Sequence, residues 1–327
     1  MNHGYLCIQG FGEGVVGSEV GTLVAGTGVD SITDPDAAAS PVLADYSTLV
    51  VAAAATSATF TTSLALTPNS TELDGKVTVA LLGVRMSPMS LDTVMRATMT
   101  VGADTYESAA ALYGQGMSRE LPSGLVEGHT LFGSGVTNIV FHDLPVSVLT
   151  TGVEFTLALD AGDIAETSIR IGSVFVGLQI PVEFSSRGFS WSVEPANERF
   201  SSRAGVNYSS DGVMQRVCSF DVQRSRFELL SGIGDTFYAD GVPIPNLFRA
   251  SLASIGQPML LSAYPYPLTN QSWSDTVTDV EQRVMSVRQN FFSMYGLLER
   301  SADLSLEEYT QQLNTEYRTR FRFGEVR

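Results

Sequence analysis

Histidines and cysteines are the first residues to test for chemistry, and this chain has few of them. Its three histidines are His3, His129 and His142, and its two cysteines are Cys7 and Cys218. No histidine has another histidine, a cysteine or a carboxylate at the spacing that metal sites use on one helix face. The cysteines are too few for a disulfide framework and too far apart for a metal knuckle, so we expect two buried free thiols.

The adjacent pair His142-Asp143 is a candidate for general acid–base chemistry, since a histidine beside a carboxylate can form half of a catalytic dyad. The Leu144-Pro145 that follows is typical of a loop, and a solvated loop pair is the reading we expect. No GxSxG, HExxH or lysine-bearing phosphate-loop motif occurs. The sequence therefore predicts no catalytic residue, no metal site and no cofactor, and it predicts that the protein is not an enzyme.

Three arginines stand at alternate positions of an expected strand: Arg318, Arg320 and Arg322. Such residues share one face of the strand, and their charges repel unless carboxylates lie opposite. One interpretation is a subunit contact, in which each guanidinium group binds a carboxylate of a neighbouring subunit. The alternative is the solvated face of an edge strand, where charge blocks unwanted pairing.

Four aromatic residues are candidates for exposed contacts. Tyr264 and Tyr266 belong to a stiff Tyr-Pro-Tyr-Pro stretch, and Trp191 and Trp273 flank polar segments. Large rings on stiff loops can anchor a partner. Packing as lids over the core is the alternative.

The net charge limits the kinds of partner. The 327 residues carry a formal net charge of −16, and lysine occurs only once. Residues 1–180 hold 5 basic and 18 acidic side chains, a net charge of −13, whereas residues 181–327 hold 14 basic and 17 acidic, a net charge of −3. Without a basic cluster to neutralise phosphates, nucleic-acid binding is not expected.

Hydropathy excludes other classes of protein. A hydrophobic fraction of 44% is too high for a disordered chain. No apolar run reaches the roughly 18 residues that a membrane span needs. The N-terminus has no basic residue ahead of an apolar core, so we expect no signal peptide and no membrane insertion.

Periodicity predicts a mainly β chain in three parts. Residues 1–40 are glycine-rich and are expected to form an arm or loop region; no helix follows their GxGxxG-like spacing, so a nucleotide loop is not expected. Residues 41–184 show short strands between turns, which is typical of an antiparallel β-sandwich. The expected strands of this part are 58–64, 76–82, 93–101, 138–141, 152–159 and 168–176.

Residues 185–327 are expected to form an α+β unit built on an antiparallel sheet. Helical patterns cover 226–238 and 245–255, and Ser305-Leu306-Glu307-Glu308 fits a capping box that opens a short helix. The expected strands of this part are 216–222, 258–263, 282–287, 291–298 and 316–323.

The order of these patterns resembles the distal tail proteins of siphophages, which are structural proteins of the tail tip and baseplate. The resemblance covers about residues 75–327 and rests on the patterns at 171–177, 185–208, 220–222, 257–261, 294–298 and 317–323. Residues 79–87, followed by Arg96, are similar to the discoidin-like, jelly-roll sandwich modules that precede this unit in some tailed phages. The glycine-rich residues 1–40 match no family pattern.

The resemblance implies a homo-oligomeric ring, commonly a hexamer, between the tail tube protein and the tail hub and baseplate proteins. We then expect a virion protein, assembled in the host cytoplasm, through which DNA passes without being bound, because a lumen lined by carboxylates repels phosphates. A carbohydrate-binding β-sandwich protein that contacts host-surface glycans is the second hypothesis. An envelope hydrolase is the third, and tail-terminator and head-decoration roles stay open because they also lack catalytic motifs.

Overall fold

The computed structural model is mainly β, with antiparallel sheets, as the sequence predicts at this coarse level. No helix in the described part of the chain is long and apolar enough to cross a membrane. The structure describes residues 3–8, 23–33, 47–64, 76–87, 93–112, 137–145, 147–148, 152–159, 164–195, 199–201, 207–209, 214–225, 237–239, 242–244, 259–262, Asn290, 292–299, 307–311 and 314–325.

Two sheets contribute to the larger hydrophobic core. The five-stranded sheet has the order β2 (Val24–Ala25), β5 (Ser57–Ser63), β10 (Gly152–Leu159), β7 (Thr93–Val101), β8 (Asp104–Leu112). The other sheet has twelve strands, and its first part contains β3 (Val29–Thr33), β4 (Ser47–Val51), β11 (Ser168–Ile171), β6 (Val77–Ser87) and β9 (Thr137–Leu144). Alternate residues of both sheets are buried together, among them Phe60, Phe155, Val79, Phe141 and Ile169.

The remaining long strands close a ring of hydrogen-bonded pairs. The ring runs through β1 (His3–Ile8), β18 (Met259–Ser262), β19 (Ser293–Glu299), β21 (Asn314–Glu325), β15 (Met214–Ser225) and β12 (Ser173–Pro195). Each strand pairs antiparallel with the next, and β12 pairs again with β1, which is the pairing of a six-stranded barrel. The N-terminal strand therefore occupies the position between β12 and β18 that closes the ring.

Strands β6 and β9 form a layer between two hydrophobic clusters. On β6, Val79 and Leu81 face the core shared with the five-stranded sheet. The alternate residues Ala80 and Leu82 face a second cluster, together with Leu260 and other residues of the ring strands. Since both faces of this layer are buried, all eight residues of β9 are buried as well.

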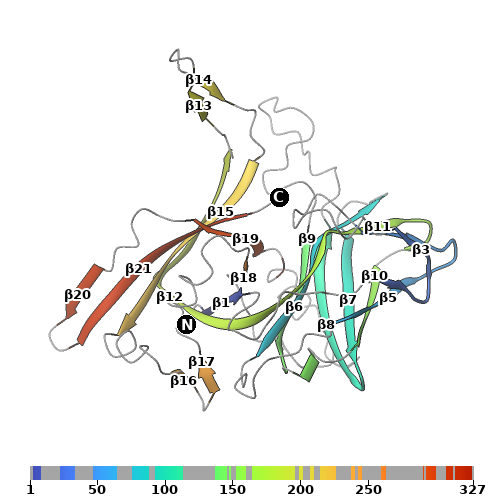
Figure 1. Ribbon diagram of the computed structural model, residues 1–327, viewed down its shortest axis with the longest axis horizontal. Coiled ribbons are helices and arrows are strands. Elements are labelled where there is room, and N and C mark those ends of the chain that lie inside the picture. Colours follow the sequence, from blue (N-terminus) through green and yellow to red (C-terminus); the bar gives the residue numbers. More distant parts are fainter. Residues whose placement is uncertain are drawn as a thin grey trace.

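Strand β12 links the two parts of the fold. It runs from Ser173 to Pro195 without a break, through residues 184 and 185, where the sequence suggested a domain boundary. Its first half pairs with β6 and β1, and its second half pairs with β15 after a register shift between Phe184 and Phe189. Figure 1 shows β12 and β15 extending away from the ring toward β13 (Arg199–Ser201) and β14 (Asn207–Ser209), and β21 extending with β20 (Glu307–Gln311) in another direction.

The strands predicted in residues 41–184 are confirmed, except that 168–176 is divided at Gly172 between β11 and the start of β12; β7 and β10 have the predicted bounds. In the second part, β15, β18, β19 and β21 confirm four predicted strands. The capping-box helix is wrong, because Glu307 and Glu308 begin β20, which pairs with β21 over five residue pairs. Phe237 and Tyr238 lie in β16 (Phe237–Ala239), paired with β17 (Val242–Ile244), and not in a helix. The other residues of 226–238, and the segments 245–255 and 282–287, lie outside the described residues.

Candidate functional site

A β-bulge places His142 and Asp143 on the same side of the sheet. In the β6–β9 pair, Val79 lies opposite Phe141 and Val77 lies opposite Leu144, so His142 and Asp143 together oppose the single residue Thr78. Asp143 has a φ of 55°, a left-handed conformation in which aspartate is more common than most residues. Bulges re-aim side chains in this way and are enriched next to functional sites.

The expectation of a solvated loop pair at His142-Asp143 is wrong. Both residues belong to β9, and only 2% of His142 and 7% of Asp143 is exposed. Their burial follows from the position of β9 between two hydrophobic clusters. A buried histidine and carboxylate need polar partners, because an unpaired polar group away from water is costly.

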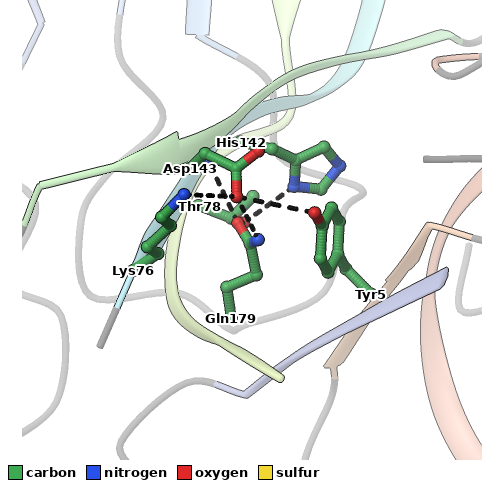
Figure 2. Close-up of polar contacts among 6 residues, drawn as sticks. All are labelled: Tyr5, Lys76, Thr78, His142, Asp143 and Gln179. Atoms are coloured by element: carbon green, nitrogen blue, oxygen red, sulfur yellow. Dashed lines mark hydrogen bonds and ion pairs between the residues drawn. The ribbon is translucent and has the colours of Figure 1, made fainter. Parts of the chain in front are cut away.

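Strands β1, β6 and β12, together with Lys76 just before β6, supply those partners (Figure 2). The Thr78 hydroxyl group lies 2.8 Å from Nδ1 of His142, 3.1 Å from Oε1 of Gln179 and 3.2 Å from Sγ of Cys7. Gln179 holds Asp143 twice: its Nε2 donates to Oδ1 at 2.7 Å, and its Oε1 accepts from the backbone N–H at 2.9 Å.

The network ends at Tyr5 on one side and at Lys76 on the other. The Tyr5 hydroxyl group donates to Asp143 Oδ1 at 3.5 Å, and its ring lies 5.0 Å from the His142 ring, measured between centroids. The Lys76 ammonium group lies 3.5 Å from the same carboxylate oxygen and is 56% exposed. Among the residues drawn in Figure 2, Lys76 alone is largely in solvent, so the network is otherwise internal.

The hydrogen bonds assign the tautomer of His142. Gln179 must present Oε1 to the Asp143 N–H, so Oε1 can only accept from Thr78. The single hydroxyl proton of Thr78 is used there, and Nδ1 of His142 must therefore donate to the Thr78 oxygen. Nε2 is then the unprotonated nitrogen, and it has no hydrogen-bond partner among the described residues.

Burial favours the neutral forms of three groups in this network, His142, Cys7 and Tyr5. It lowers the pKa of His142 to about 4, against the opposing effect of the neighbouring Asp143 charge. It raises the pKa of the Cys7 thiol to about 12, partly offset by the hydrogen bond to Thr78. Burial and the Asp143 charge also raise the pKa of Tyr5.

This chemistry does not suit acid–base or nucleophilic catalysis. The Asp143 carboxylate is held by Gln179, Tyr5 and Lys76, whereas His142 Nδ1 faces Thr78, so histidine and carboxylate are not arranged as a dyad. Cys7 is a thiol at neutral pH, and the thiolate is the nucleophilic form. The network instead joins β1, the strand that closes the ring, to β6, β9 and β12.

Two asparagines make further links between the parts of the fold. Asn138 accepts from the N–H of Gly83, which has a φ of 67°, and donates to the carbonyl group of Ser293 in β19. Asn290 accepts from the N–H of Val140 in β9 and donates to Ser108 and to the carbonyl group of Ala109 in β8. The Asn290 side chain thus links β8 to β9, which are not paired with each other.

The three predicted contact arginines have defined register positions in β21. Arg320 lies opposite Asp221 of β15. Arg318 lies opposite Gln223 of β15 and Glu307 of β20, and Arg322 lies opposite Ser219 of β15 and Glu299 of β19. The edge-strand alternative is wrong at Arg318 and Arg322, since β21 is paired on both sides there. An aspartate or glutamate therefore lies opposite each of the three arginines in the strand register. The subunit contact stays a prediction.

The other predicted residues are only partly described. Trp191 lies in β12 opposite Cys218, and Tyr264, Tyr266 and Trp273 lie outside the described residues. Cys7 and Cys218 are buried free thiols, as predicted. No local sequence signal pointed to Thr78 and Gln179, which are 101 positions apart and join the network only through strand pairing.

No family model, no curated protein and no solved structure matches this chain. Among the described residues, no group of three or more histidine, cysteine, aspartate or glutamate side chains could hold a metal ion.

Proposed function

We propose that this protein is a structural subunit of a tailed-phage virion, which forms a homo-oligomeric ring at the tail tip and joins the tail tube to the baseplate hub. Its neighbours would be the tail tube protein and the hub and baseplate proteins, and DNA would pass through the ring without being bound. The sequence resemblance to distal tail proteins suggests this role. The hexameric order that the resemblance implies belongs to the same proposal.

The observation that carries the proposal is the continuous antiparallel sheet that joins the two parts of the chain. Twelve strands are connected by hydrogen bonds from β3 through β12 to β21 and β20. The buried links at Thr78, Asn138 and Asn290 tie the same parts a second time. A continuous sheet of this kind suits a structural role, in which one end of the protein holds the other in place. Catalysis needs an accessible reactive group instead.

We further propose that the two sheets around the larger core form a β-sandwich, and that residues 185–327 form a separate functional unit. The shared core of inward-facing residues supports the sandwich. The long antiparallel projections, β12 with β15 and β21 with β20, are suited to contacts with neighbouring subunits (Figure 1). Of the three predicted arginines, Arg318 lies where β21 pairs with β20, whereas Arg322 lies in the ring, opposite Glu299 of β19.

Imaging tests the proposal directly. The purified full chain should form rings in negative stain, and the same protein should be located at the tail tip by antibody labelling of intact virions. A chain that stays monomeric at every concentration, together with virions that lack it, would refute the proposal.

The second candidate is a carbohydrate-binding protein that contacts the host envelope. It is favoured by the outer face of the five-stranded sheet, where the hydroxyl groups of Thr59 and Thr156 lie 3.2 Å apart in a row of small polar side chains. A glycan array with the purified chain tests it, and an array without a binder argues against it.

A further inference from the structure

Strand β1 fills a slot between β12 and β18, and all of its strand partners are far away in the sequence. Six of its residues pair with β12, and four of them also pair with β18. Ile8 lies opposite Leu178 on one side and Met259 on the other. These partners come 170 and 251 positions after Ile8 (178 − 8 and 259 − 8), so no local contact keeps β1 beside the strands that follow it.

The slot recognises β1 through its side chains as well as through its backbone. Leu6 and Cys7 are buried, and Cys7 belongs to the second hydrophobic cluster. The Cys7 thiol donates to the Thr78 hydroxyl group, and the Tyr5 hydroxyl group donates to Asp143. An empty slot would leave the facing edges of β12 and β18 unpaired, and such edges accept another strand. A β1 strand makes the same contacts in this slot whichever copy of the chain supplies it.

The connection from β1 to the next strands crosses the molecule. Figure 1 shows β1 in the ring and β3 on the opposite side of β6. Strands β12, β6, β11 and β4 lie between β1 and β3 in the sheet order, so the crossing covers five strand spacings, or about 24 Å. Residues 9–22 make this connection, and when fully extended they would span at most about 50 Å, twice the crossing within one chain.

The length and composition of this connection do not tie β1 to the slot of its own chain. Residues 9–22 contain five glycines and no proline, and glycine permits many backbone conformations. A tether favours the slot of its own chain by raising the local concentration of the strand, and this advantage falls as the tether becomes longer. Since the tether must already cross the molecule, the slot of a contacting copy lies within the same reach.

The order of synthesis also separates β1 from its own slot. Strand β18, which forms one wall of the slot, is synthesised about 250 residues after β1. At the usual rate of about 5–20 residues per second, β1 waits for roughly 10–50 s before this wall exists. In a growing assembly, the completed slot of a neighbouring copy is available to β1 during that time.

We propose that neighbouring copies of this protein exchange this strand, so that β1 of each copy lies between β12 and β18 of the next. The inference rests on the proposed ring and names the contact that closes it. A strand of one copy meets a slot of another, which makes the contact heterologous, and heterologous contacts form rings when the rotation closes. The occupant is a second copy of this chain, because β1 carries the tyrosine and the thiol that the slot binds. The glycine-rich segment after β1 is then the arm between two copies.

Disulfide trapping tests which copy supplies β1. Cys7 lies directly opposite Leu260 in the register, so Leu260→Cys places a second thiol across from it. Opposed residues of antiparallel strands have Cα atoms about 4.5–5.5 Å apart, a separation that a disulfide accepts. The variant also carries Cys218→Ala, which removes the other cysteine. After assembly with oxidised glutathione, most of the chain should run on a non-reducing gel as linked dimers and longer species up to the complete ring.

A mixture of two different chains removes the possibility of a disulfide within one chain. The first chain carries only Cys218→Ala and keeps Cys7, and the second carries Cys7→Ser, Leu260→Cys and Cys218→Ala. Co-expressed, they should give linked dimers that contain one chain of each kind, identified by mass spectrometry of the joined peptides. Each chain expressed alone is the matched control and should run as a monomer. If the buried Leu260→Cys prevents folding, Ile8→Cys and Met259→Cys, also directly opposed, replace the pair in chains that carry Cys7→Ser.

The outcomes separate this inference from the proposed function. Rings in which every disulfide joins β1 to β18 of the same chain, and mixtures that form rings without a mixed dimer, would overturn the exchange and leave the ring in place. Linked dimers that are the largest species would support the exchange and overturn the ring. A wild-type chain that never associates would overturn both.

Discussion

The Thr78 hydroxyl group is the centre of the buried network, and Thr78→Val removes it while keeping the shape of the side chain. In the variant, the Nδ1–H of His142 loses its acceptor. A change of tautomer does not help, because a proton on Nε2 would also lack a partner among the described residues. Gln179 Oε1 keeps the backbone N–H of Asp143 and is affected less.

The expected loss follows from these contacts. One orphaned buried donor costs about 1–3 kcal/mol, and the lost hydrogen bonds add about 1 kcal/mol, so we expect ~3 kcal/mol in total. At about 2.1 cal/mol/K per residue, the entropy of unfolding of a chain of 327 residues is ~0.7 kcal/mol/K, and Tm should fall by about 4 °C.

Calorimetry with two controls checks this prediction. Thr78→Ser keeps the hydroxyl group and should lose only about 1 kcal/mol, the value of one buried methyl group. Thr33→Val, at an exposed position of β3, should change Tm little. If Thr78→Val unfolds at the same temperature as Thr78→Ser, the hydroxyl group does not stabilise the fold and the reasoning is refuted. Nitrogen chemical shifts of His142 should independently show a proton on Nδ1.

Three other perturbations test the burial of His142, the close approach of β19 and β21 at Gly296, and the burial of Cys7. The pKa of His142 is about 4 in the folded chain and 6.5 ordinarily, so the unfolded chain binds more protons between these two pH values. The free energy of unfolding should therefore fall by about 3 kcal/mol as the pH falls through this window. If His142→Asn shows the same dependence of unfolding free energy on pH, this prediction is contradicted. Gly296→Ala should destabilise the β19–β21 pairing by at least ~3 kcal/mol, because a Cβ at this position would lie 2.0 Å from the Gly324 carbonyl oxygen. Gly152→Ala, where a Cβ would meet open space, is the control. Equal unfolding curves for the two variants would refute the steric argument. Cys7 should react with iodoacetamide at pH 8 at least ~100-fold more slowly in the folded than in the unfolded chain, and rapid labelling of folded protein would contradict its burial.

Much of the strand pattern was predictable because burial of one face leaves a clear alternation. In β7, Met95, Ala97 and Met99 are buried and the residues between them are not, and the predicted bounds agree with the structure. Strand β8 was missed, because its Glu-Ser-Ala-Ala-Ala run has no such contrast and suits a helix equally well. Its place as a strand depends on pairing with β7.

The candidate site was less predictable because it depends on register. His142 and Asp143 are adjacent in the sequence, but their common direction results from a bulge opposite Thr78. Gln179 comes from β12 and Tyr5 from β1, and neither carries a local signal of a polar partner. The Leu-Pro that follows the pair suggested a loop, whereas the structure continues β9 to Leu144 before the chain turns.

Charge patterns on strands show most clearly why sheet order is needed. Arg318, Arg320 and Arg322 stood out in the sequence because they are close together in it, and the register then placed a residue with a carboxylate opposite each one. Arg85 and Arg170 did not stand out, because 84 positions lie between them, and yet strand pairing brings them directly opposite each other. The repulsion between charges is decided by neighbours across the sheet and only secondarily by neighbours along the chain.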